Sequence, residues 1–129
     1  MRGRERIEAY FTACGTGDAD RVAEHFTEDA VIYDTNHPPV RSAAAIGTFW
    51  SGVQARWGGA TWVVDRCIGA GDEAAIEWTM RAPLPRPFTM RGSEWYRFDA
   101  DGRIAEIRQY WTFDRTRLDT ALVDYPYPD

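Results

Sequence analysis

Apolar residues recur at helical spacing in three parts of the first half of the chain. Between residues 4 and 14 they stand three and four positions apart, which predicts an amphipathic helix that ends at two glycines. A second, short helix is predicted to start at a capping Asp18 or Asp20 and to end near residue 26. A third is predicted over residues 42–57, where large apolar side chains form one wide stripe behind a serine cap.

An alternation with a period of two replaces the helical spacing after residue 59. It predicts strands over about residues 60–68, 73–81, 87–98 and 103–113, and one earlier strand over 30–34 precedes the third helix. This order predicts an α+β fold in which three N-terminal helices pack on one face of a curved antiparallel sheet. We expect residues 1–129 to form a single domain, with residues 116–129 as an extended tail.

Composition narrows the class of protein. With 129 residues, of which 44% are hydrophobic and 14% aromatic, the chain is too apolar for a disordered protein. A net charge of −5 without a basic cluster argues against nucleic-acid binding. No apolar run reaches the roughly 20 residues of a membrane helix, and the charged first residues lack the apolar core of a secretion signal. We therefore expect a cytoplasmic protein with no membrane partner.

The residue types that are missing limit the chemistry. All 15 basic residues are arginines, which excludes a lysine Schiff base, a pyridoxal aldimine and a Walker A phosphate loop. The two cysteines, Cys14 and Cys67, stand far apart and give no redox or thiolate-zinc spacing. We expect no metal and no organic cofactor, so that any catalysis would use carboxylates, phenols and histidine.

Several strings of the sequence carry a family resemblance. They are FTEDAVIYD at residues 26–34, the apolar helix around 45–50, and RFDADGRI at 97–104, followed by Tyr110-Trp111. Over about residues 5–113 the chain resembles the nuclear-transport-factor-2-like superfamily, which includes the SnoaL-like cyclases and the ketosteroid isomerases. The resemblance implies a cone-shaped fold with a pocket between helices and sheet, and a homodimer formed through the outer face of the sheet. These strings mark the fold rather than an activity, because the superfamily also contains binding and scaffold proteins.

The resemblance also implies a catalytic trio. In the isomerases of the superfamily, a tyrosine of the first helix and an acid of a late strand hold an enolate oxygen, while an aspartate at the end of the first strand moves the proton. These roles fall on Tyr10, Glu94 and Asp34, at the spacings of the isomerase pattern and with Glu94 in place of an aspartate. To donate a hydrogen bond near pH 7, Glu94 must be buried enough to raise its pKa from about 4.3 to about 7.

The residue pattern itself points the same side chains inward. Glu94 shares a strand face with Tyr96 and Phe98, and Tyr10 lies on the apolar stripe of its helix. Asp34 ends a strand whose Ala30 and Ile32 share its face, so it would be the third polar group in one aromatic cavity, which is typical of a small-molecule site. The resemblance places Trp111 on the pocket wall, and the other aromatic residues expected to contact the ligand are Phe26, Phe49, Trp50 and Trp78.

The leading hypothesis is a cofactor-independent isomerase or cyclase that acts through an enolate on an apolar carbonyl compound, such as a polyketide, terpenoid or steroid-like substrate. Asp34 would be the base, and Tyr10 and Glu94 would hold the oxyanion. The alternatives are a non-catalytic protein that binds a small ligand in the same pocket, a dimeric association module, and an epoxide-opening enzyme. The last would need an Asp-Arg-Asp set, for which the sequence offers no clear counterpart.

Each candidate residue also has a structural alternative. Tyr10 could be an ordinary core tyrosine, and Asp34 a turn residue that accepts hydrogen bonds from loop N–H groups. Glu94 could pair with Arg91 or Arg108, which would keep it ionised. His37 lies in a proline-rich loop, and we expect an exposed loop histidine there rather than a proton donor at the pocket rim.

Overall fold

The computed structural model describes residues 2–83, 86–112, 114, 116 and 119–128. Within these residues the chain forms three helices and six strands. The helices are α1 (Arg2–Thr16), α2 (Ala19–Ala23) and α3 (Ala43–Arg56), and the strands are β1 (Phe26–Asp34), β2 (Val40–Arg41), β3 (Thr61–Ala70), β4 (Glu73–Ala82), β5 (Phe88–Phe98) and β6 (Ile104–Trp111).

The predicted capping residues begin α2 and α3. The Asp18 side chain accepts hydrogen bonds from two backbone N–H groups of α2, and the Ser42 hydroxyl accepts one from Ala45 at 3.1 Å. The predicted end of the second helix at residue 26 is wrong, because Phe26 is the first residue of β1 and is paired with Ile104 of β6. Strand β1 therefore begins four residues before the predicted strand, which covers residues 30–34.

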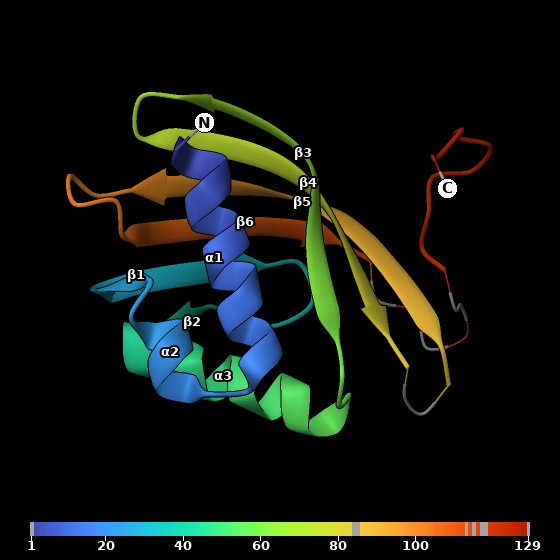
Figure 1. Cartoon of the computed structure of the whole chain (residues 1–129), viewed down its shortest axis with the longest axis horizontal. Helices are drawn as coiled ribbons and strands as arrows, with labels where there is room; N and C mark the ends of the chain where they lie inside the picture. The colour runs from blue at the N-terminus through green and yellow to red at the C-terminus, as the bar shows by residue number, and fades with distance from the viewer. Residues whose placement is uncertain (1, 84–85, 113, 115, 117–118, 129) are drawn as a thin grey trace.

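The strands form one curved sheet in the order β2-β1-β6-β5-β4-β3 (Figure 1). Strands β3 to β6 are an antiparallel meander, as the sequence predicts. The expectation of an antiparallel sheet is wrong for one pair, since β1 and β6 are parallel. A parallel pair needs a long crossover, and here β2, α3 and strands β3 to β5 lie between the two strands in the chain. The short β2 at the edge was not predicted, because its two residues give no alternation.

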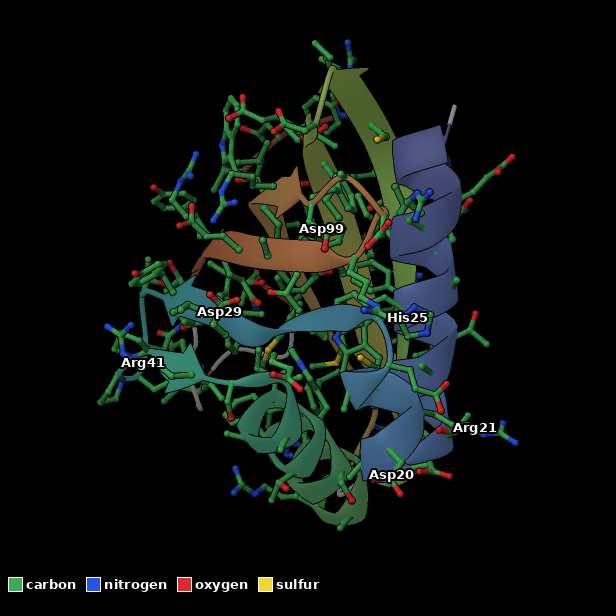
Figure 2. The ribbon with its side chains drawn as sticks, turned by 90° about the vertical axis from the view of Figure 1, so that its left-hand side faces the viewer. Asp20, Arg21, His25, Asp29, Arg41 and Asp99 are labelled. Carbon is green, nitrogen blue, oxygen red and sulfur yellow. The ribbon has the colours of Figure 1, made fainter. Side chains whose placement is uncertain are left out.

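The helices cover one face of the sheet; α1 crosses in front of β4, β5 and β6 in the view of Figure 1 and also packs against β3. Helices α2 and α3 pack closely where Gly47 meets Ala19. This approach is possible because glycine has no Cβ atom, which would collide with the carbonyl oxygen of Ala19. His25, after α2, lies between β1 and α1 (Figure 2), with its ring 6.4 Å from that of Tyr10. Among the described helices, none is long and apolar enough to cross a membrane.

After β6 the chain returns to the start of β5. Asp119 forms a parallel bridge with Thr89, and the Arg91 guanidinium bonds to the Asp119 carboxylate at 2.8 Å. The same guanidinium lies 4.1 Å from the ring centroid of Tyr127. Phe113, where the last predicted strand ends, lies outside the described residues, as do positions 117, 118 and 129 of the predicted tail.

Candidate functional site

A cavity of about 290 Å³ opens between α3 and the inner face of the sheet. Its walls come from the apolar stripe of α3 and from alternate residues of β1, β3, β4 and β6, because one face of each strand points towards the helices. Five of the six tryptophans of the chain line it. The full lining is Ile32, Asp34, Asn36, His37, Phe49, Trp50, Val53, Arg56, Trp57, Trp62, Trp78, Met80, Gln109 and Trp111.

Asp34 is a carboxylate in the cavity wall, at the end of β1, with a side chain that is 1% exposed. Its Oδ1 accepts hydrogen bonds from the backbone N–H and the side-chain amide of Asn36, at 2.7 and 3.2 Å. Its Oδ2 accepts a bond from the indole N–H of Trp111 at 2.8 Å. These donors stabilise a carboxylate anion. The bond from the Asn36 backbone matches the turn interpretation of Asp34, and the position in the cavity wall matches the site interpretation.

His37 also lines the cavity, so the expectation of an ordinary exposed loop histidine is wrong. Its side chain is 27% exposed, and its ring packs 5.0 Å from that of Phe49, which holds the loop against α3. The Nδ1 atom lies 2.9 Å from the carbonyl oxygen of Pro38, which only accepts, so Nδ1 carries the proton. Nε2 lies 3.5 Å from Asp34 Oδ2, where a protonated ring forms an ion pair with the carboxylate and a neutral ring presents a lone pair.

Glu94 is buried on the inner face of β5 among uncharged partners. Its Oε1 accepts a hydrogen bond from the Tyr96 hydroxyl at 2.9 Å. Burial raises the pKa of Glu94 to about 8; the bond from Tyr96 opposes this shift, and the negative charge of Asp34 adds to it. The alternative pairing with arginine is wrong, because Arg91 bonds to Asp119 and Arg108 bonds to Glu106.

Tyr10 belongs to α1, and its side chain points towards the sheet. It lies close to Glu94 but does not line the main cavity. It is 1% exposed, and burial, followed by the charges of Cys14 and Glu94, raises its pKa well above 10. Tyr10 and Glu94 border a second, much smaller hollow of about 10 Å³. The hollow and the cavity have four wall residues in common, so these side chains stand between a ligand in the cavity and Tyr10 or Glu94: Trp50, Trp62, Trp78 and Gln109.

A chain of hydrogen bonds links Asp34 to Glu94. With its amide nitrogen towards β5, Gln109 donates to Glu94 Oε2 at 2.8 Å, and its amide oxygen accepts from Trp111 Nε1 at 3.3 Å. The same indole N–H donates to Asp34. The two acids are therefore connected through neutral side chains, with no arginine between them in the described structure.

Residues 7–107 match the SnoaL-like domain family, which is more than half of the chain. The chain belongs to the SnoaL-like domain family. No curated protein sequence matches this SnoaL-like domain. Solved structures do.

One similar crystal structure is a protein of unknown function with a cystatin-like fold from Methylobium petroleophilum PM1, at a TM-score of 0.77 and 28% identity over 88% of this chain and 78% of that one. Another is a hypothetical protein with a ketosteroid isomerase-like fold from Catenulispora acidiphila DSM 44928, solved in complex with trimethylamine. It has a TM-score of 0.75 and 17% identity, over 84% of this chain and 85% of that one, and shows likeness of fold alone.

The sequence-predicted residues of the SnoaL-like domain divide between the two spaces. Asp34 lines the cavity, together with four of the five expected aromatic side chains, whereas Tyr10 and Glu94 border the hollow. Phe26 is not among the lining residues and packs edge-on against Tyr10 at 5.1 Å. The sequence reasoning missed Trp62 and Gln109, although each shares a strand face with other inward residues. Asp34 is the one aspartate in the described lining, so the Asp-Arg-Asp set of an epoxide-opening enzyme is not assembled there.

Proposed function

We propose that this SnoaL-like domain is an enzyme that moves a proton on a small, mainly apolar carbonyl compound, with Asp34 as the base. The observation that carries the proposal is a buried carboxylate in the wall of an aromatic cavity, with a ring nitrogen of His37 3.5 Å from it. An apolar cavity with a few convergent polar groups is the usual form of a small-molecule site. Membership of the family and the ketosteroid isomerase-like fold support this class of chemistry without naming the substrate.

The chemical step needs no group beyond the chain and its substrate. Asp34 Oδ2 takes a proton from the carbon next to the carbonyl, and the C–H electron pair moves into an enolate whose charge rests on oxygen. In an isomerisation the same proton returns to a different carbon. In a cyclisation the enolate carbon attacks a second carbonyl, and the resulting alkoxide takes the proton. Both outcomes restore the Asp34 carboxylate.

His37 is the second proton carrier of the proposal. Because Nδ1–H is held by Pro38, the free lone pair on Nε2 faces the Asp34 oxygen that gains the proton. Protonation of Asp34 would turn the 3.5 Å contact into an O–H···N hydrogen bond. His37 is partly exposed and therefore offers a path by which the proton can exchange with water.

The size of the cavity indicates a compact substrate. One water occupies about 30 Å³ in the liquid, so a space of about 290 Å³ has room for roughly ten to fifteen non-hydrogen atoms. That suits a one-ring or two-ring ketone better than a complete steroid. Asn36, His37 and Arg56 give the lining its remaining polar groups.

The proposal is tested by hydrogen–deuterium exchange of cyclohex-2-enone in D2O, followed by proton NMR. Wild type should speed the loss of the protons next to the carbonyl, and Asp34→Asn should reduce this rate at least a hundredfold. Asp29→Asn is the matched control, because Asp29 is an exposed residue of the same strand (Figure 2) and should leave the rate unchanged. Equal rates in wild type and Asp34→Asn would reject Asp34 as the base.

A second candidate, the binding of an organic ammonium ion without catalysis, is favoured by the number of tryptophans in the cavity. Aromatic faces around a cation contribute about 0.5–2 kcal/mol each, and the Asp34 carboxylate supplies a counter-charge. The structural neighbour from Catenulispora acidiphila holds trimethylamine. Calorimetry with tetramethylammonium and with neutral tert-butyl alcohol separates the candidates, since only a cation site prefers the former.

We also propose that the face of the sheet opposite the helices joins two copies of the chain. Trp95 and Tyr110 are about half exposed there, at 47% and 51%, and Tyr33 is 38% exposed. Large exposed aromatic side chains on one face are typical of an interface.

A further inference from the structure

Gln109 stands in the wall between the cavity and the hollow. Its side chain is on the inner face of β6, and the residue is 7% exposed. One end of the amide faces Glu94 Oε2 at 2.8 Å, and the other faces Trp111 Nε1 at 3.3 Å. The position of the amide is therefore fixed at both ends. Which end carries the nitrogen depends on whether Glu94 and Trp111 each present a hydrogen-bond donor or an acceptor.

Two neighbours act on this orientation: the Trp111 N–H, which only donates, favours the amide oxygen on its side, and the charge of Glu94 acts at the other end. An ionised Glu94 only accepts, so the amide nitrogen must face it, as in the hydrogen-bond chain described above. A protonated Glu94 donates its O–H to the amide oxygen, while Oε1 still accepts from Tyr96. The amide then turns over, and its NH2 group lies on the side of Trp111 and the cavity. It makes no hydrogen bond with the Trp111 N–H, which donates to Asp34, so the NH2 needs an acceptor from the cavity.

We propose that Gln109 donates the hydrogen bond that holds the carbonyl oxygen of the ligand, and that the protonated carboxyl of Glu94 behind it keeps the amide in the donating orientation. The proposal rests on the proposed function, since it assigns the oxyanion donor of the same reaction. It gives Glu94 a positioning role and Gln109 the catalytic contact.

The geometry favours Gln109 over Tyr10, Glu94 and Trp111. Tyr10 and Glu94 border the hollow, and the Trp111 N–H is directed at Asp34. Because both contacts share Trp111 Nε1, the amide lies no more than about 6 Å from Asp34 Oδ2. A C–H bond at Asp34 and the neighbouring carbonyl oxygen at Gln109 fit within this span. Hydrogen bonds of this kind, aimed at a developing oxyanion, typically contribute a hundredfold or more to the rate.

Among the groups around Glu94, the protonation of Glu94 itself controls the orientation of the Gln109 amide. Tyr96 faces it from β5, Tyr10 and Cys14 face it from α1, and Asp34 acts on it from β1. None of the four is a cation, and burial raises the pKa of both tyrosines and of the thiol. Below about pH 8 Gln109 should present N–H to the cavity, and above it the carbonyl oxygen.

NMR of the side-chain amides tests the proposal directly. The chain has two glutamines and one asparagine, so the spectrum contains three NH2 pairs, and Gln109→Leu assigns one of them. At pH 6.5 we expect a nuclear Overhauser effect between the Trp111 indole proton and the Gln109 NH2, and at pH 9.5 we expect it to vanish. In Glu94→Gln, where the new amide donates at every pH, the effect should persist at pH 9.5. Gln54, whose NH2 bonds to Gly15 and Ala60, is the internal control.

Cyclohex-2-enone is the probe for the donor role, because its oxygen accepts and does not titrate in this range. We expect it to shift the Gln109 amide signal but not that of Gln54, and to bind about tenfold more weakly at pH 9.5 than at pH 6.5 in wild type only. An Overhauser effect that does not change with pH, or one that is lost equally in Glu94→Gln, would overturn the proposal. So would an unshifted amide in the bound complex. These readouts do not involve turnover, so they are independent of whether Asp34 is the base.

Discussion

Asp34 and Glu94 are two acids joined by only two side chains, Trp111 and Gln109, and they have opposite surroundings. Asp34 accepts three hydrogen bonds from nitrogen donors at the cavity wall. Glu94 lies in the hollow behind, where burial raises its pKa to about 8. Two neighbouring acids with such different environments are suited to different protonation states at neutral pH, which general acid–base chemistry requires.

The burial of Glu94 predicts a specific dependence of stability on pH. Its pKa is about 8 in the folded protein and 4.5 for the free side chain, so the folded state holds a proton that the unfolded state releases between these values. The contribution of this proton to the free energy of unfolding is complete below pH 4.5 and is lost as the pH rises to 8. The free energy of unfolding should therefore fall by about 5 kcal/mol across this window.

Urea unfolding at several pH values checks this expectation against Glu94→Gln, which cannot ionise at this position. The difference between the two curves isolates Glu94, because other titrating groups such as His25 are common to both proteins. Parallel curves from pH 5 to 8 would show that Glu94 is ionised in the folded state.

The contact between His37 and Asp34 predicts that exchange depends on the imidazole ring. His37→Gln should lower the rate of cyclohex-2-enone deuteration at least tenfold, because glutamine cannot pass the proton from Asp34 to water. His25→Gln is the control, since His25 packs near Tyr10 outside the cavity lining. A rate identical to that of wild type would leave His37 without a role in proton transfer.

Filling the cavity should block the ligand without unfolding the protein. Val53→Phe adds a ring on the α3 wall, and we expect the affinity for cyclohex-2-enone, measured by NMR titration, to fall at least tenfold. Val63→Phe is the matched control on β3, where the side chain is 46% exposed. Unchanged binding in Val53→Phe would place the ligand elsewhere.

The outer face of the sheet gives a prediction about association. Tyr110→Glu places a charge among exposed aromatic side chains, so it should convert a dimer to a monomer in light scattering. Val123→Glu changes an 86% exposed residue of the tail and should leave the mass as in wild type. A wild-type mass of one chain at every concentration would contradict a dimer.

Most of the fold could be predicted because its signals are local. The Asp18 and Ser42 caps, the α3 stripe and the alternation in β3 to β6 each involve residues close together in the sequence. The parallel pairing of β1 with β6 could not be predicted in this way. It depends on which strands meet after the chain has folded, and alternation only tells which face of a strand is buried.

The site was predicted in part for the same reason. Strand position and helix stripe were enough to point Asp34, Glu94 and Tyr10 inward. Strand position and helix stripe do not tell which of these inward side chains lines the cavity and which lies behind another side chain. The place of Gln109 between Glu94 and the cavity, and the fold of the His37 loop over Phe49, are set by contacts between distant residues.

The most direct test of the account is infrared spectroscopy of the folded protein as a function of pH, with Glu94→Gln as the reference. A protonated buried carboxyl has a C=O stretch that a carboxylate lacks. At pH 7 wild type should show this band, Glu94→Gln should not, and the band should disappear with a midpoint near pH 8. A wild-type spectrum at pH 7 with no band beyond that of Glu94→Gln would contradict the account, since both acids would then be charged.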